Sequence, residues 1–117
     1  MSQFMVKFMI LFAQPDQQDE FENIYNDFFA LVERMPDITR RQVIDILGSP
    51  VGETGLFRIL EVYFEDRPTM EAALRTKAGQ EAGAELRRFK PGTFEMVFAD
   101  VYEEEGGATA DPKQTGS

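Results

Sequence analysis

The chain contains no histidine and no cysteine among its 117 residues. Histidine is the usual acid or base near neutral pH, cysteine is the usual thiol nucleophile, and both are common metal ligands. Any chemistry must therefore use carboxylates, arginines, tyrosines or a borrowed cofactor. We expect no metal site and no resident cofactor. Because no disulfide can form, a cytoplasmic location is the default expectation.

Positive charge is also scarce, with 12 Lys and Arg against 21 Asp and Glu, which gives a formal net charge of −9. Such a field repels phosphate backbones and anionic lipid surfaces, so we expect neither nucleic acid nor a membrane as a partner. No apolar run reaches the ~18 residues that a membrane-spanning helix needs. The apolar opening segment has no basic region before it and is interrupted by Lys7, so it predicts a strand and not a signal peptide.

The apolar content is sufficient for one folded unit. Hydrophobic residues make up 43% of the chain, with 11 Phe and 3 Tyr among them, and the length suits a single domain. We predict one domain over residues 1–102. Residues 103–117 lack large apolar side chains, which predicts an acidic and polar disordered tail.

The hydrophobic pattern predicts four strands and two helical regions. In the first strand, the residues that point to one face and those that point to the other are nearly all apolar, which is typical of a strand buried on both faces. Apolar residues spaced three or four positions apart, along one face of a helix, predict the first helix. The predicted strands cover residues 4–12, 38–47, 56–65 and 93–102. The predicted helices cover residues 16–35, a segment from Pro68 to Lys77, and a continuation over residues 80–89 that Gly79 and Gly83 weaken.

The resulting order, β-α-β-β-α-β, is that of a ferredoxin-like α+β fold. A turn rich in glycine and proline favours a hairpin between the second and third strands. Right-handed crossovers place both helices on one face of a four-stranded antiparallel sheet. The other face also carries large apolar side chains, so we expect a second copy of the chain to cover it in a two-fold homodimer.

Several runs, in this order, are similar to the EthD family of the dimeric α/β barrel superfamily. They are Phe-Glu-Asn-Ile-Tyr at 21–25, Met-Pro-Asp-Ile at 35–38, Ile-Leu-Gly-Ser-Pro at 46–50, Met-Glu-Ala-Ala-Leu at 70–74, Gly-Gln at 79–80, and Phe89. The resemblance extends over residues 4–102. It implies a ferredoxin-like barrel dimer far more securely than it implies an oxidative activity.

One departure from the family pattern bears on function. Many members carry His-x-Pro-Leu in the second half of the first helix, where this chain has Phe28-Phe29-Ala30-Leu31. The resemblance therefore implies that any chemistry resting on that histidine is lost here. The same absence closes the helix-histidine route to haem that occurs elsewhere in the superfamily.

The resemblance also suggests a pocket between sheet and helices, which polar residues on the predicted elements could line. These residues are Tyr25, Arg40, Gln42, Asp45, Arg58, Glu61, Tyr63 and Asp100. An arginine beside a tyrosine can orient an anionic or phenolic ligand, and a desolvated carboxylate can remove a proton from carbon. Our candidate catalytic residues are Tyr25, Arg40, Asp45 and Tyr63, and our candidate ligand-binding residues are Tyr25, Phe28, Arg40, Arg58 and Tyr63. The competing interpretation is that these groups form structural ion pairs and that Phe28 fills the core.

Three functions remain open at this point. The first is an EthD-like homodimer that binds a small hydrophobic or aromatic molecule between sheet and helices. The second is a cofactor-independent monooxygenase or isomerase, which requires Tyr25, Arg40, Asp45 or Tyr63 to converge on one pocket. The third is a structural or regulatory dimer whose pocket is filled by its own Phe and Met side chains.

Overall fold

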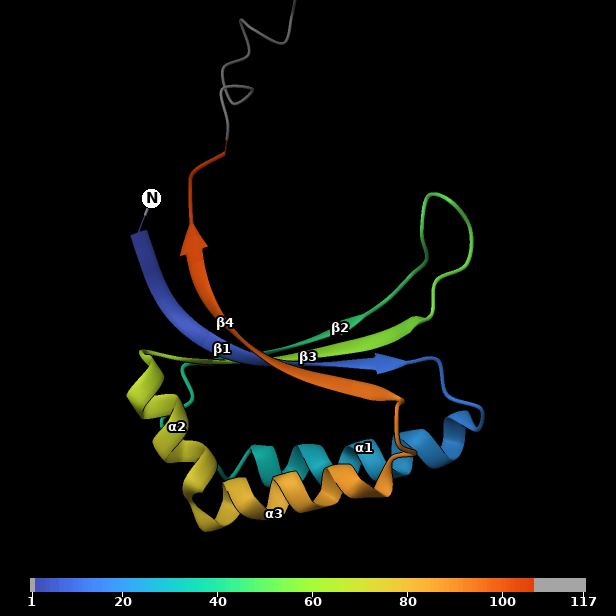
Figure 1. Ribbon diagram of the computed structural model, residues 1–117, viewed down its shortest axis with the longest axis horizontal. Helices are drawn as coiled ribbons and strands as arrows, with labels where there is room; N and C mark the ends of the chain where they lie inside the picture. Colours follow the sequence, from blue (N-terminus) through green and yellow to red (C-terminus); the bar gives the residue numbers. More distant parts are fainter. Residues whose placement is uncertain (1, 107–117) are drawn as a thin grey trace, which may run out of the picture.

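The computed structural model describes residues 2–106, with eight elements in chain order (Figure 1). They are β1 (Ser2–Ala13), α1 (Gln18–Val32), β2 (Arg40–Asp45), β3 (Leu56–Phe64), α2 (Arg67–Arg75), α3 (Lys77–Glu85), the 3-10 helix η1 (Leu86–Arg88) and β4 (Phe94–Glu103). Most of the predicted tail, residues 107–117, lies outside the described residues. The division into a domain and a tail therefore stays a prediction.

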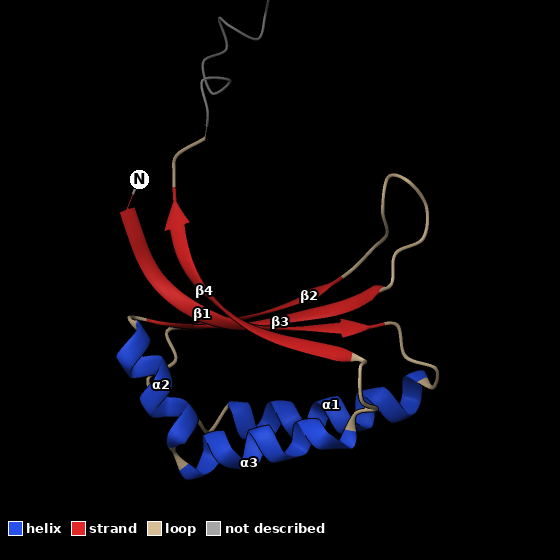
Figure 2. Ribbon diagram, in the orientation of Figure 1, coloured by secondary structure: helices blue, strands red, loops and turns tan. Residues whose placement is uncertain are grey.

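The four strands form one antiparallel sheet in the order β2-β3-β1-β4. All of the helices lie on the same side of this sheet (Figure 2). The predicted ferredoxin-like α+β fold and its β2–β3 hairpin are therefore confirmed. In the described part of the chain, no element covers the second side of the sheet, which we call the open face.

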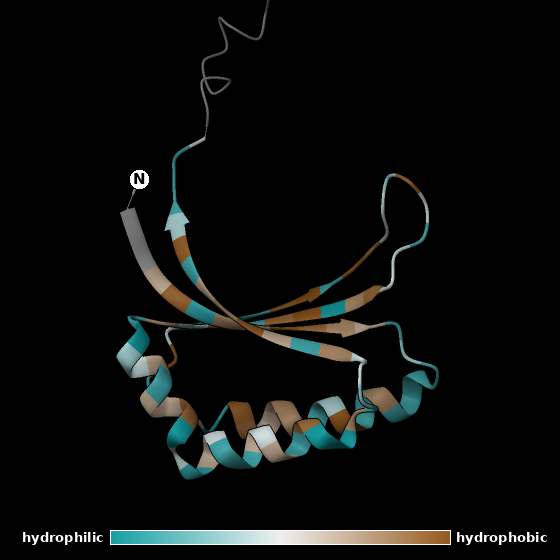
Figure 3. Ribbon diagram, in the orientation of Figure 1, coloured by the Kyte–Doolittle hydropathy of each residue, from teal (hydrophilic) through white to brown (hydrophobic). Residues whose placement is uncertain are grey.

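β1 is apolar on both sides because it is a central strand, paired with β3 and with β4. Val6, Phe8, Ile10 and Phe12 point toward the helices and are buried. Met9 and Leu11 alternate with them and lie half-buried on the open face. The hydropathy colouring shows brown, apolar segments along much of the sheet, whereas teal and brown alternate along the helices below it (Figure 3).

The helical region after β3 differs from the prediction at one junction. α2 ends at Arg75, and α3 already begins at Lys77 instead of near residue 80. The Thr76 side chain accepts a hydrogen bond from the Gly79 backbone N–H at 3.1 Å, which caps the new helix. A Cβ at Gly79 would lie 2.5 Å from the backbone oxygens of Ala73 and Leu74. Gly79 thus permits the close junction of the two helices and does not merely weaken a single one.

Two other elements are shorter than their patterns indicate. α1 ends at Val32 and is followed by a turn in which Asp37 has a φ of 66°, so the apolar Met35 belongs to the helix exit. β2 covers only residues 40–45, because Leu47 lies in the loop and is fully exposed. No helix of the described residues is long and apolar enough to cross a membrane. The cytoplasmic location stays a prediction.

Candidate functional site

An apolar cavity of about 290 Å³ lies between the helix-facing side of the sheet and α3. It exists because α3 packs mainly against α1 and α2, and leaves the inner side of β4 less covered. Met96 of β4, which faces the helices opposite Ile10, is only half-buried as a result. The lining residues are Phe8, Ile10, Phe28, Val32, Met35, Leu74, Gly79, Gln80, Ala82, Gly83, Leu86 and Met96.

Small residues of α3 form the rim of this cavity. A Cβ built on Gly83 would meet no other atom within 4 Å, so this position opens on free space. Gln80 is the only polar side chain of the lining, and its amide already donates to the Arg75 carbonyl at 3.0 Å. The cavity therefore presents hydrocarbon and aromatic surface to anything that enters it.

Phe28 contributes one wall of the cavity and is 2% exposed. It occupies the position at which the resemblance places a histidine in many family members. An aromatic ring at this position offers contact area but no hydrogen bond. Phe28, a predicted ligand-binding residue, therefore does line a cavity. The other four predicted ligand-binding residues line neither this cavity nor the two smaller pockets described below; they are Tyr25, Arg40, Arg58 and Tyr63.

One group of polar candidates lies on the helix side, around Arg58. The guanidinium donates to both Glu22 carboxylate oxygens at 2.8 and 2.9 Å, and to Asp45 at 2.7 Å. These hydrogen bonds, chiefly that with Glu22, raise the pKa of Arg58, although burial opposes them. The pairing of β1 with β3 shifts its register between Phe12 and Ala13, so that Phe57, which precedes Arg58, has no partner residue on β1. Through its hydrogen bonds to Glu22 and Asp45, Arg58 ties α1, β2 and β3 together.

Tyr25 lies beside this group, with its ring 4.6 Å from the Arg58 guanidinium and stacked on Phe21 and Phe29. The side chain is buried, and its hydroxyl has no hydrogen-bond partner among the described residues. Burial raises the pKa of Tyr25 to about 12, in spite of the opposing effect of the Arg58 charge. The hydroxyl therefore stays protonated and lies away from the cavity lining.

The other group of polar candidates lies on the open face, around Tyr63. The Tyr63 hydroxyl lies 2.7 Å from Glu61 and 3.1 Å from the Gln42 side-chain oxygen. Glu61 also pairs with Lys7 at 3.2 Å, and the Arg40 guanidinium stacks 4.3 Å from the Tyr63 ring centre. Glu61 and Tyr63 are 8% and 4% exposed, although no helix covers them. We call these five residues the open-face cluster.

The structure does not bring the four candidate catalytic residues together. Asp45 pairs with Arg58 on the helix side, near Tyr25, whereas Arg40 pairs with Tyr63 on the open face. Side chains of a strand alternate between its faces, so positions 58 and 63, five apart, must point to opposite sides. The shared pocket that an acid–base mechanism requires is not formed by this set. Asp100, also on the helix side, lines a separate small pocket of about 70 Å³ near Arg67.

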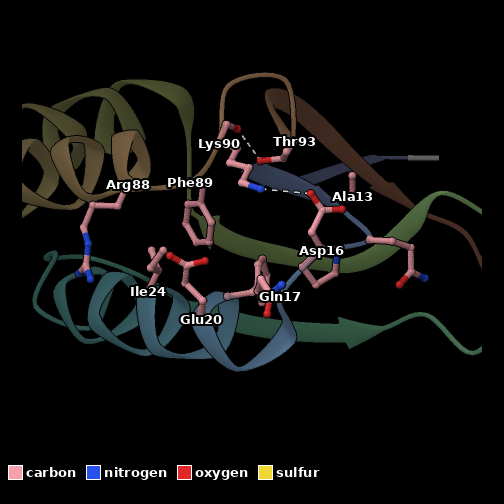
Figure 4. Close-up of a pocket in the computed structure, with 12 residues that line it drawn as sticks. Ala13, Asp16, Gln17, Glu20, Ile24, Arg88, Phe89, Lys90 and Thr93 are labelled. Carbon is pink, nitrogen blue, oxygen red and sulfur yellow. Dashed lines mark hydrogen bonds and ion pairs between the residues drawn. The ribbon is translucent and has the colours of Figure 1, made fainter.

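A further cavity of about 120 Å³ lies where the turn after β1 meets the segment between η1 and β4. Phe21, Ile24 and Phe89 form its apolar part, and Lys90 reaches Asp16 across its rim at 3.1 Å (Figure 4). Sequence reasoning did not single out this place or the α3 rim of the 290 Å³ cavity. The spacing of Gly79 and Gly83, four residues apart on one helix face, was the available signal for the latter.

Among residues 2–106, no group of three acidic side chains is arranged to hold a metal ion. The expectation that no cofactor is bound stays a prediction. The two charged groups hold their ion pairs within themselves, and the cavity between the sheet and α3 has no ionisable lining residue. The charged candidates and the apolar cavity are therefore separate features of the structure.

No family model matches the sequence, and no curated protein is significantly similar to it. Solved structures do match. An EthD family protein from Bacillus halodurans superposes with a TM-score of 0.78 at 27% identity, over 84% of this chain and 99% of that one. A dimeric ferredoxin-like protein of unknown function from Bacteroides fragilis gives 0.61 at 20% identity, over 85% and 98%. SnoaB, a cofactor-independent oxygenase from Streptomyces nogalater, gives 0.64 at 17%, over 86% and 96%.

These matches, together with the strand order, place the chain in the class of ferredoxin-like α+β proteins. Within that class the chain is EthD-like, because the Bacillus halodurans protein matches over nearly its whole length at an identity above that of the other two. The resemblance predicted from the local sequence runs is thereby confirmed.

Proposed function

We propose that this EthD-like chain forms a homodimer that binds a small hydrophobic or aromatic molecule in the cavity between the sheet and α3. The observation that carries the proposal is the cavity itself. Its volume of about 290 Å³ is at the lower end of the range, roughly 300–1,000 Å³, that is typical of small-molecule sites. Its lining is apolar apart from Gln80.

A ligand explains the cavity better than self-filling does. Phe8, Phe28 and Met35 already point into this region and are buried, yet they leave the space open. Protein interiors are close-packed, and an apolar void sacrifices the dispersion contacts of its walls. An apolar molecule that enters regains those contacts, which favours a binding function over a purely structural dimer.

A second copy of the chain is the proposed cover of the open face. Half-buried apolar side chains on this face, among them Met9, Leu11 and Val97, surround the open-face cluster. An apolar sheet surface of this kind is characteristic of an interface. The Bacteroides fragilis neighbour of the same fold is dimeric, which supports the same assembly here.

The alternative of a cofactor-independent monooxygenase or isomerase draws support from the fold that the chain shares with SnoaB. The lining of the cavity argues against it, because none of the lining residues can act as a general base. We therefore assign binding, without a reaction, to the cavity.

Cavity occupancy is tested with N-phenyl-1-naphthylamine, a neutral dye whose fluorescence rises in apolar surroundings. We expect the dye to bind the wild-type protein, and Gly83→Leu, which places a side chain at the rim, to weaken binding at least tenfold. Ala84→Leu adds the same side chain to the same helix on an exposed position outside the lining, and it should bind as the wild type does. Unchanged binding by Gly83→Leu would contradict the assigned site.

The assembly is tested by light scattering at micromolar concentration, with native mass spectrometry of the same sample. We expect a dimer, and Met9→Glu should dissociate it because the new charge would be buried against the second copy. Ala72→Glu adds the same charge to an exposed position of α2 and should leave the dimer intact. A monomeric wild-type protein would eliminate the proposed cover of the open face.

A further inference from the structure

We infer that the cavity selects for neutral ligands and excludes molecules that carry a carboxylate or another anionic group. This inference rests on the proposed function, and it names the ligand class of the same site. It predicts discrimination by charge between ligands of equal size and shape.

The lining of the cavity offers no charged partner to an anion. None of its twelve residues can carry a charge, and the amide of Gln80 is already engaged with the Arg75 carbonyl. An anion that enters must give up its water and finds no donor in exchange. Transfer of an unpaired ionised group into apolar surroundings is among the most unfavourable steps in protein chemistry.

The two mostly buried cations of the sheet line no part of the cavity and are paired with carboxylates. Arg58 donates to Glu22 and Asp45, and Lys7 pairs with Glu61 on the far side of the sheet. An Arg58 released to meet an anion would leave two carboxylates without a partner. Neither the lining residues nor these two cations are therefore available to pair with an anion in the cavity.

Phe28 of α1 is a specificity-determining residue of this site. Its ring is 2% exposed and forms part of the cavity wall from α1. The ring face contacts an aromatic or aliphatic ligand, and it carries no group that could stabilise negative charge. A titratable side chain at this single position would change the charge preference of the whole cavity.

The experiment compares two ligands of the same shape, 2-acetylnaphthalene and 2-naphthoate, which differ in a methyl ketone against a carboxylate. Binding to the wild-type protein is measured by isothermal titration or ligand-observed NMR at neutral pH. We expect 2-naphthoate to bind at least tenfold more weakly. The net charge of −9 also repels anions at long range, so the comparison is repeated at 1 M salt, where the Debye length is about 3 Å. The preference should persist there.

Two variants test whether the preference originates in the cavity. Gly83→Arg should weaken binding of both ligands, as Gly83→Leu does, but its cation should spare 2-naphthoate, so that the preference falls at least threefold. Ala84→Arg adds the same charge outside the lining and should not change the preference. Phe28→His introduces the only histidine of the chain at a buried position, where desolvation lowers an imidazole pKa, so affinity for 2-naphthoate should rise as pH falls below about 6.5. The wild-type protein should show no such rise.

The outcomes separate this inference from the proposed function. Equal binding of the two ligands, or tighter binding of 2-naphthoate, would overturn the charge selection while the cavity remained a binding site. A preference that vanishes at high salt, or that Gly83→Arg and Ala84→Arg change equally, would also overturn it. Binding of neither ligand, together with no response of the neutral dye, would overturn the proposed function itself.

Discussion

The Arg58 guanidinium lies 4.6 Å from the centre of the Tyr25 ring, while the Tyr25 hydroxyl has no hydrogen-bond partner among the described residues. The contact is thus made by the face of the ring, whose negative quadrupole attracts the cation. Arg58 is held in this position by Glu22 and Asp45. Tyr25 therefore contributes to the fold through the packing of its ring. Its buried hydroxyl, which lacks a partner, lowers the stability of the folded state.

Removal of that hydroxyl by Tyr25→Phe should leave stability unchanged or raise it by about 1 kcal/mol, because a buried donor without a partner disappears. Urea denaturation at pH 7 measures the change. Binding of the neutral dye should be unaffected, since Tyr25 does not line the cavity. If Tyr25→Phe lost dye binding while its stability stayed intact, Tyr25 would have to be part of the ligand site.

The same variant should alter stability at high pH. Burial raises the pKa of Tyr25 from 10.0 to about 12, so between these values the unfolded chain loses the proton and the folded protein keeps it. Deprotonation of the unfolded state makes unfolding more favourable as pH rises through this window. The wild-type protein should therefore lose stability more steeply than Tyr25→Phe between about pH 10 and pH 12. Parallel stability curves for the two proteins would contradict the burial of the phenol.

Arg58→Met should lower the free energy of unfolding by about 2 kcal/mol, because the half-buried Glu22 carboxylate loses its bidentate partner. Asp45 is largely solvated and can recover water, which limits the loss. Arg67→Met breaks an exposed pair with Glu71 in α2 and should change stability by no more than about 0.5 kcal/mol. Urea denaturation measures both free energies of unfolding. Equal losses for the two substitutions would show that Arg58 does not stabilise the junction of α1, β2 and β3.

Two glycines on one helix should respond in opposite ways to alanine. Gly79→Ala places a Cβ 2.5 Å from backbone oxygens of α2, so we expect a loss of about 2 kcal/mol or more from forced separation of the helices. Gly83→Ala meets no atom and should stabilise the protein by up to about 1 kcal/mol through helix propensity. Thermal unfolding followed by circular dichroism gives both values. A tolerant Gly79 would mean that the α2–α3 junction can shift.

The Lys7–Glu61 pair should show strong coupling in a double-mutant cycle. Glu61→Met alone leaves the Lys7 ammonium without its carboxylate on a mostly buried surface, which should cost about 1–3 kcal/mol. The double variant Lys7→Met/Glu61→Met should recover most of this loss, because an apolar pair replaces a buried ion pair. Denaturation at one fixed protein concentration keeps any dimer contribution constant. Additive single effects would show that the two groups act independently.

Much of the fold could be predicted because its signals are local. The alternation along β1 and the one-stripe pattern of α1 identify a central strand and a covering helix from neighbouring residues alone. The same period-two rule could also have placed Arg58 and Tyr63 on opposite faces, had it been applied across β3. Errors fell at element ends, where Leu47 continues an apolar pattern although it lies in a loop.

The candidate site was less predictable, because it depends on distances between segments far apart in the chain. Polar residue types drew attention to Tyr25 and Arg40, yet each belongs to a different cluster on a different face. The cavity is lined by residues such as Leu74 and Met96, which look like ordinary core positions in the sequence. The neighbouring sequence does not distinguish a core side chain that packs against another side chain from one that lines a cavity.

By itself, the sequence determined the order of the elements, the apolar surplus on both sides of the sheet, and the absence of histidine and cysteine chemistry. These properties follow from residue type and from periods of 2 and 3.6, which the backbone geometry imposes. Only the tertiary structure decided which charges neutralise one another and where space is left. The charge pairs depend on the strand register that brings β1, β2 and β3 together and on the docking of α1. The space depends on how closely α3 approaches β4, which the packing of α3 on α1 and the close helix junction at Gly79 set.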